Sequence, residues 1–130
     1  MRTRIIFFIL IMALALVLAG CSSNSKSPAA QAVESYLNAM IGKQADTLSA
    51  LSCAAWEEQA ILEMDSFEAV SASLDGLSCS EAGTENGQTL VTCQGKILTS
   101  YQGEAREFDL SRWTYQVAQE GGDWRVCGYR

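Results

Sequence analysis

Histidine is absent from the 130 residues of the sequence. Because histidine is the commonest general base and completes the Ser/His/Asp and Cys/His arrangements, these catalytic sites are excluded. Zinc sites are also disfavoured, since the cysteines lack the CxxC spacing that many such sites use. We therefore expect a protein that is not an enzyme and that has no metal site and no cofactor.

Basic residues are scarce, with 9 Lys and Arg against 15 Asp and Glu and a net charge of −6 at pH 7. An acidic surface repels nucleic acid and anionic lipid headgroups. We therefore expect no nucleic-acid partner. The acidity by itself indicates only an exported domain that stays soluble.

The chain has one apolar run, Ile5 to Ala19, which is shorter than the about 20 residues that a membrane-spanning helix needs. Arg2 and Arg4 precede it, and the next basic residue is Lys26. A positive start, a short apolar segment and small residues after it are typical of an export signal. Ordinary secretion and a retained membrane helix are the weaker alternatives.

The run closes on Leu18-Ala19-Gly20-Cys21, which resembles the lipobox of bacterial lipoproteins. The resemblance implies a signal peptide over 1–20 that is removed, and a diacylglycerol on the sulfur of Cys21. Residues 21–27 are then the lipidated cysteine and a flexible, serine-rich tether. Two acyl chains (palmitate or similar) hold a protein stably at a membrane. The expected location is the extracytoplasmic face of the cell membrane.

The single proline, Pro28, follows Ser27, a good N-cap, and this pair predicts the start of a helix that ends at Gly42. The apolar residues with helical spacing are Val33, Tyr36, Leu37, Met40 and Ile41. A second helical pattern covers 46–64, as one helix or as two.

From Phe67 onward the apolar period approaches two, and turn signals divide the rest into about four strands. Asn86-Gly87 is the strongest turn signal. A bulge at Gly76 would explain one phase shift, and a bulge near Ser111, or a strand buried on both sides, would explain a change of face. The expected fold class is α+β, with two to three N-terminal helices packed on a curved antiparallel meander in one domain, 28–130.

Gly42…Asp46 between the helices and the closing Gly122-Asp123-Trp124-Arg125-Val126 resemble small exported domains of the nuclear-transport-factor-two-like (cystatin-like) family. The resemblance covers about 29–130. It implies that the last strand packs under the first helices.

Apart from Cys21, four cysteines remain in an expected oxidising compartment, and they allow three pairings. Cys79 and Cys93 flank the Asn86-Gly87 turn, and a loop of three or five residues would place them directly opposite. A strict two-residue loop would offset them by one. We predict the disulfides Cys79–Cys93 and Cys53–Cys127, both with a structural role.

The family resemblance points to four candidate catalytic residues, namely Glu107, Asp109, Tyr101 and Tyr115. Glu107 and Asp109 alternate with apolar residues, so we interpret them as a solvated strand face. The tyrosines are interpreted as core or rim aromatics.

Two charged clusters also suggest sites. The first cluster is Glu57, Glu58 and Glu63. It suggests a calcium site, but the usual oxygen-rich loop is missing, so we interpret it as a solvated helix face.

The second cluster is Arg106, Arg112 and Arg125. These arginines could bind an anion, or they could form cross-strand pairs with Glu104, Glu107 or Asp123.

Taken together, these features predict a membrane-anchored lipoprotein that is a non-catalytic interaction module of the cell envelope. Its partner would be another envelope protein or a second copy of the chain. One alternative is a small-ligand-binding lipoprotein with a pocket between helices and sheet. The other is an enzyme of the same fold. The ligand-binding residues are not identifiable from the sequence.

Overall fold

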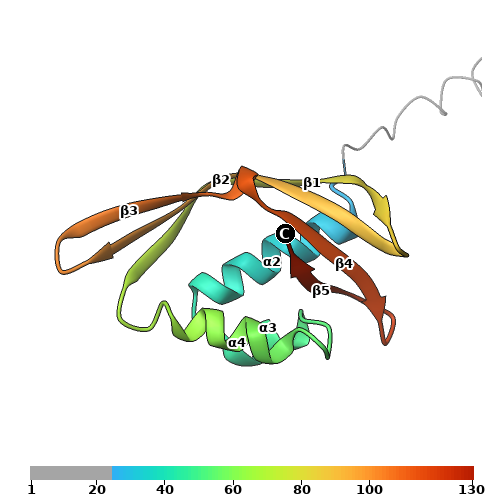
Figure 1. Cartoon of the computed structure of the whole chain (residues 1–130), viewed down its shortest axis with the longest axis horizontal. Coiled ribbons are helices and arrows are strands. Elements are labelled where there is room, and N and C mark those ends of the chain that lie inside the picture. The colour runs from blue at the N-terminus through green and yellow to red at the C-terminus, as the bar shows by residue number, and fades with distance from the viewer. Residues whose placement is uncertain (1–24) are drawn as a thin grey trace, which may run out of the picture.

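The computed structural model describes residues 25–130, so the predicted signal peptide and the lipidation site Cys21 lie outside the described residues. In this part of the chain, three helices precede a five-stranded antiparallel sheet (Figure 1). The predicted α+β class is confirmed. The elements are α2 (Pro28–Ile41), α3 (Ala45–Ala50), α4 (Glu57–Asp65), β1 (Ser71–Glu85), β2 (Gln88–Tyr101), β3 (Glu104–Asp109), the short 3-10 helix η1 (Leu110–Arg112), β4 (Thr114–Glu120) and β5 (Asp123–Tyr129).

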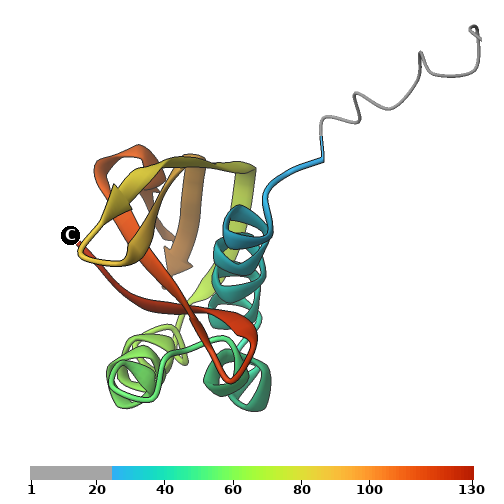
Figure 2. The same ribbon diagram turned by 90° about the vertical axis from the view of Figure 1, so that its right-hand side faces the viewer.

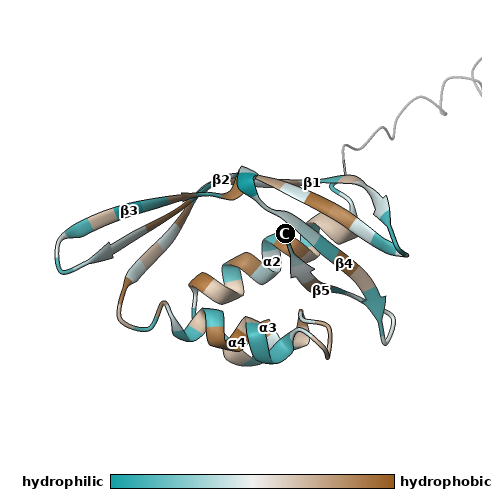
Figure 3. Cartoon of the chain, in the orientation of Figure 1, coloured by the Kyte–Doolittle hydropathy of each residue, from teal (hydrophilic) through white to brown (hydrophobic). Residues whose placement is uncertain are grey.

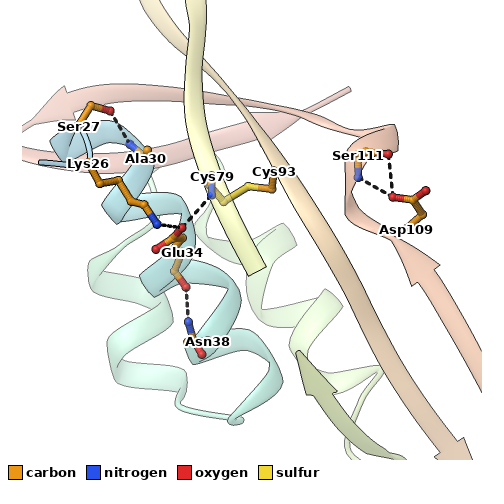
Figure 4. Close-up of a disulfide and its surroundings, with 9 residues drawn as sticks. All are labelled: Lys26, Ser27, Ala30, Glu34, Asn38, Cys79, Cys93, Asp109 and Ser111. Carbon is orange, nitrogen blue, oxygen red and sulfur yellow. Dashed lines mark hydrogen bonds and ion pairs between the residues drawn. A yellow bond between two sulfur atoms is a disulfide. The ribbon is translucent and has the colours of Figure 1, made fainter. Parts of the chain in front are cut away.

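Helix α2 begins and ends where the sequence predicts. The Ser27 side chain accepts a hydrogen bond from the backbone N–H of Ala30 at 3.2 Å, and Pro28 occupies the first turn. Glu34, on the same helix, accepts from the backbone N–H of Cys79 at 2.8 Å and forms an ion pair with Lys26 (Figure 4). The hydrogen bond to Cys79 attaches α2 to β1, and the ion pair attaches the segment before α2 to the helix.

The helical pattern over 46–64 is two helices, because the chain between them is used by the sheet. Ser52 forms a parallel bridge with Val126 of β5. The backbone N–H of Cys53 donates to Val126 O, and the N–H of Val126 donates to Leu51 O, both at 2.8 Å. This segment therefore covers the outer edge of β5 instead of continuing the helix.

The sheet has five strands where about four were predicted, because the predicted third strand is interrupted. Strands β3 and β4 both pair with β2, on either side of η1. Asp109 Oδ1 accepts hydrogen bonds from Ser111 N and Oγ at 2.9 and 2.7 Å, which begins the η1 turn (Figure 4). If the β2–β3 register continued past η1, Thr114 would lie opposite Val91. Tyr115 lies there instead, so the chain contains one extra residue. This extra residue is the physical reason for the change of face near Ser111.

The loop of the β1–β2 hairpin is shorter than the three or five residues that the disulfide prediction required. Glu85 pairs with Gln88, so the turn is the strict two-residue Asn86-Gly87, with positive φ at both residues (51° and 78°). A bulge between Glu81 and Gly83 adds one residue to β1 and brings Cys79 opposite Cys93 again. A second register shift contains Gly76, as predicted.

Both cysteine pairs lie at disulfide distance in the predicted pairing. The Cα atoms of Cys53 and Cys127 are 4.8 Å apart, and those of Cys79 and Cys93 are 4.0 Å apart (Figure 4). The first pair joins the loop after α3 to β5, and the second joins β1 to β2. The disulfides therefore tie the sheet both to itself and to the helical layer.

The core lies between α2 and the concave side of the sheet (Figures 1 and 2). Its largest fully buried apolar side chains come from every layer: Val33, Tyr36, Leu37, Leu48, Val91, Leu110, Val117 and Val126. Beyond the core, the outer half of β2 and the whole of β3 project as a hairpin, residues 96–109, that we call the arm (Figure 1). The β2 strand of the arm also pairs with the beginning of β1, residues 71–75. Every β3 residue is exposed, and this strand is mainly hydrophilic (Figure 3).

None of the helices found between residues 25 and 130 has both the length and the apolar character to cross a membrane.

Candidate ligand-binding cavity

A cavity of about 560 Å³ lies between the arm and the helices. The second half of α2 forms one side with Leu37 and Met40, and the segment after α4 forms another with Phe67 and Val70. Lys43 Nζ donates to the backbone carbonyl of Glu68 at 3.0 Å, which holds that segment against the end of α2. The cavity is therefore formed by parts of the chain that are distant in sequence.

The inner face of the arm is the remaining wall. Because side chains alternate along a strand, the cross-strand pairs Ile97–Phe108, Thr99–Arg106 and Tyr101–Glu104 share one face, and all six residues line the cavity. Phe108 and Tyr101 are 41% and 50% exposed. Apolar side chains on this wall thus remain open to a ligand.

The floor of the cavity is an aromatic cluster centred on Tyr129 of β5. Its ring lies 5.7 Å from Trp56, 6.0 Å from Trp113 and 5.7 Å from Tyr115, between ring centroids and at angles of 55–80°. Edge-to-face and tilted pairs of this kind are favourable. Three of these rings, those of Trp113, Tyr115 and Tyr129, line the cavity directly.

Several polar atoms meet in this apolar floor. Trp56 Nε1 donates to Tyr36 Oη at 3.0 Å, and Tyr129 Oη donates to Glu63 Oε1 at 3.1 Å. Burial raises the pKa of Tyr36 and of Tyr115 far above the ordinary value near 10, and the charge of Glu63 adds to the rise. Both phenols therefore stay protonated as hydrogen-bond donors over the whole physiological range.

The predicted catalytic candidates separate into two groups. Tyr115 and Tyr101 line the cavity, on its floor and at the tip of the arm. Glu107 and Asp109 are exposed. Glu107 Oε2 accepts from Lys96 Nζ at 2.6 Å, and the hydrogen bonds from Ser111 lower the pKa of Asp109. The two carboxylates are thus a solvated strand face, as the sequence indicated.

The three arginines do not converge. Arg106 lines the cavity, Arg112 lies in η1, and Arg125 is 3.9 Å from Asp123 on its own strand. Arg106 forms no ion pair with another residue of the described chain.

The three glutamates of the acidic cluster do not come together at one site. Glu57 and Glu58 are exposed at the start of α4, whereas Glu63 is half-buried and lines the cavity. The interpretation of Glu63 as part of a solvated helix face is therefore wrong, because Glu63 is half-buried and accepts a hydrogen bond from Tyr129 of β5. Between residues 25 and 130, no group of carboxylate or cysteine side chains is arranged to hold a metal ion.

Sequence reasoning missed Tyr36, Glu63 and Tyr129 as members of one site. They come from α2, α4 and β5, and no spacing in the sequence relates them. The only available signal was the number of aromatic residues on the last two strands.

The sequence matches no family model, and no curated protein matches it either. The structure is similar to the solution structure of a SEC-C motif containing protein from Rhodopseudomonas palustris, with a TM-score of 0.51 and 12% identity. The likeness covers 81% of this chain and 80% of that one. At this identity, what the two chains share is the fold.

Proposed function

We propose that this protein is a lipid-anchored lipoprotein that binds a small, largely apolar ligand in the cavity between the arm and the helices. The observation that carries the proposal is the cavity itself. Its volume of about 560 Å³ lies within the usual range of ligand sites, and its walls are mostly aromatic and aliphatic with a few convergent polar groups. This is the small-ligand alternative, which the cavity favours over an interaction module.

The anchoring part of the proposal rests on the sequence before residue 25. The lipobox-like Leu18-Ala19-Gly20-Cys21 would place a diacylglycerol close to the start of α2 at Pro28. The two cysteine pairs support an oxidising, extracytoplasmic compartment. We propose no catalysis, because histidine is absent and Glu63 Oε1 is already bound by Tyr129 and Gln59.

Binding of the neutral fluorophore N-phenylnaphthylamine tests the proposal, because its emission rises in apolar surroundings. Thr99→Phe fills the cavity from β2 and should weaken binding by about tenfold or more, or about 1.4 kcal/mol. Leu98→Phe is the matched control, since Leu98 lies on the opposite face of the same strand. Equal binding of the probe by the wild type and both variants would mean that the probe binds outside the cavity. If the wild type does not bind the probe, the proposal is wrong.

An interaction module is the second candidate, and the exposed arm favours it. Phe108 and Tyr101 are exposed there, and β3 pairs only with β2. Four of the six β3 residues are charged, which disfavours pairing with another strand. Native mass spectrometry of the lipidated protein separates the two: a dimer or hetero-complex without a retained small molecule would support the module.

A further inference from the structure

The floor of the cavity contains two phenol hydroxyls with no hydrogen-bond acceptor. Tyr36 and Tyr115 are 0% and 3% exposed, and both line the cavity. Tyr36 Oη accepts from Trp56 Nε1, which leaves its own proton free to donate. Over residues 25–130, neither hydroxyl donates a hydrogen bond to another group of the chain. The Tyr36 hydroxyl is fully buried, whereas the Tyr115 hydroxyl can be reached from the cavity, so a ligand atom that accepts from Tyr115 is favoured.

An acceptor lies near the Tyr115 donor. Glu63 Oε1 accepts from Tyr129 and from Gln59, at 3.1 and 3.2 Å, while its Oε2 has no partner in residues 25–130. The ring of Tyr115 lies 5.7 Å from that of Tyr129, whose hydroxyl is bonded to Glu63, and all three residues line the cavity. The floor therefore presents one reachable donor, the Tyr115 hydroxyl, near one negatively charged acceptor.

We propose that this floor binds a primary carboxamide, the head of a ligand whose apolar body lies along the arm; the inference rests on the proposed function. The carbonyl oxygen accepts from the Tyr115 hydroxyl, and the amide N–H donates to Glu63 Oε2. The inner face of the arm, with Ile97 and Phe108, contacts the body.

Other head groups fit this floor less well. A carboxylate can accept from the Tyr115 hydroxyl, but Glu63 repels its charge. An ammonium can pair with Glu63, but it leaves the Tyr115 donor unpaired. A hydrocarbon end satisfies neither atom. The combination of donor and acceptor thus selects a group that is both acceptor and donor and carries no charge.

Octanamide, octanoate and octylammonium share one apolar chain and differ in this head group. We expect octanamide to displace N-phenylnaphthylamine from the protein at concentrations about tenfold lower than the other two. Tyr115→Phe should weaken octanamide binding by about threefold to tenfold, the net effect of one hydrogen bond, and this loss should exceed any change in probe binding. Leu98→Phe, on the face of the arm that points away from the cavity, is the control and should bind octanamide as the wild type does.

The infrared carbonyl band of carbon-13-labelled octanamide gives a second measurement that does not depend on affinity. The band should move to lower frequency in the wild-type complex and return toward its free position in Tyr115→Phe. The inference is wrong if octanoate or octylammonium binds as tightly as octanamide, or if the carbonyl band does not shift. In either case, binding of the probe would still support the proposed function. No binding of the probe or of any octyl compound would overturn both.

Discussion

At the scale of single residues, the hydrogen bond between Trp56 Nε1 and Tyr36 Oη joins the segment before α4 to α2. In Tyr36→Phe the indole N–H loses its acceptor while the ring still fills its place. We expect a loss of about 1–2 kcal/mol in the free energy of unfolding, measured by urea denaturation. The exposed Tyr101→Phe should change it by less than about 0.5 kcal/mol. Equal effects would mean that the bond contributes nothing to stability.

The buried tyrosines also predict how stability depends on pH. Burial raises the folded-state pKa of Tyr36 and Tyr115 above the unfolded value near 10. The stabilisation is therefore complete below about pH 10 and is lost as the pH rises further, because the unfolded state releases these protons first. Each tyrosine contributes a slope of about 1.4 kcal/mol per pH unit in that window.

In Tyr115→Phe, the free energy of unfolding should fall less steeply with pH above about pH 10, because one of the two buried tyrosines no longer contributes. Urea denaturation at several pH values from 8 to 11 measures it. An unchanged slope in the variant would contradict the burial of this phenol.

At the scale of the elements, the bulge at Gly76 depends on close packing against Gly95 at the base of the arm. A Cβ on Gly95 would lie 2.6 Å from the backbone oxygen of Asp75, and the φ of Gly95 is +104°. Gly95→Ala should therefore destabilise the protein by more than the strain of positive φ alone, which is about 1–3 kcal/mol.

Gly103→Ala is the control for that substitution. Its φ of +85° is also positive, but a Cβ there would meet nothing within 4 Å. Thermal denaturation of the two variants separates strain from steric overlap. A Gly95→Ala variant as stable as Gly103→Ala would show that the two strands can move apart at the bulge.

Local signals in the sequence predicted the elements whose causes are local. Ser27 and Pro28 begin α2 by themselves, and Asn86-Gly87 forms its turn without help from other segments. The break between α3 and α4 was not decided, because a bridge between Ser52 and the distant Val126 causes it. The second bulge, near Gly83, was missed for the same reason, since only the pairing with β2 reveals it.

The candidate site was less predictable than the fold. A pocket between helices and sheet was anticipated as an alternative, but its residues were not identified, and Tyr115 and Tyr101 were named only as candidate catalytic residues. The floor of the cavity depends on Tyr36 and Glu63, which hydrophobic periodicity marks only as one inward and one outward position on two helices. Their meeting is a property of the packed molecule.

At the scale of the whole molecule, the two disulfides should contribute unequally to stability. They close loops with sequence separations of 74 and 14 residues. In the chain-entropy model these loops correspond to about 4.5 and about 3 kcal/mol. Urea denaturation of the double variants C53A/C127A and C79A/C93A should rank them in that order. The reverse order would mean that packing around the cysteines, and not loop closure, dominates.

Neither disulfide restrains the arm, and this has a consequence for motion. Cys79 and Cys93 lie on the core side of Gly95, and Cys53 and Cys127 lie in the helical layer and β5. The η1 turn also separates the ladder of β3 from that of β4. Residues 96–100 of the arm stay paired with β1 on their other edge. The edge strand β3, residues 104–109, can thus open as a separate unit while the cross-linked body stays folded.

Hydrogen–deuterium exchange should show this difference. The amides of β3 should exchange at least about tenfold faster than those of β4, because their opening does not require unfolding of the core. Equal protection would mean that β3 opens only with the rest of the molecule. If β3 does exchange faster, a ligand can enter the cavity when its own wall opens, and this opening needs less free energy than global unfolding.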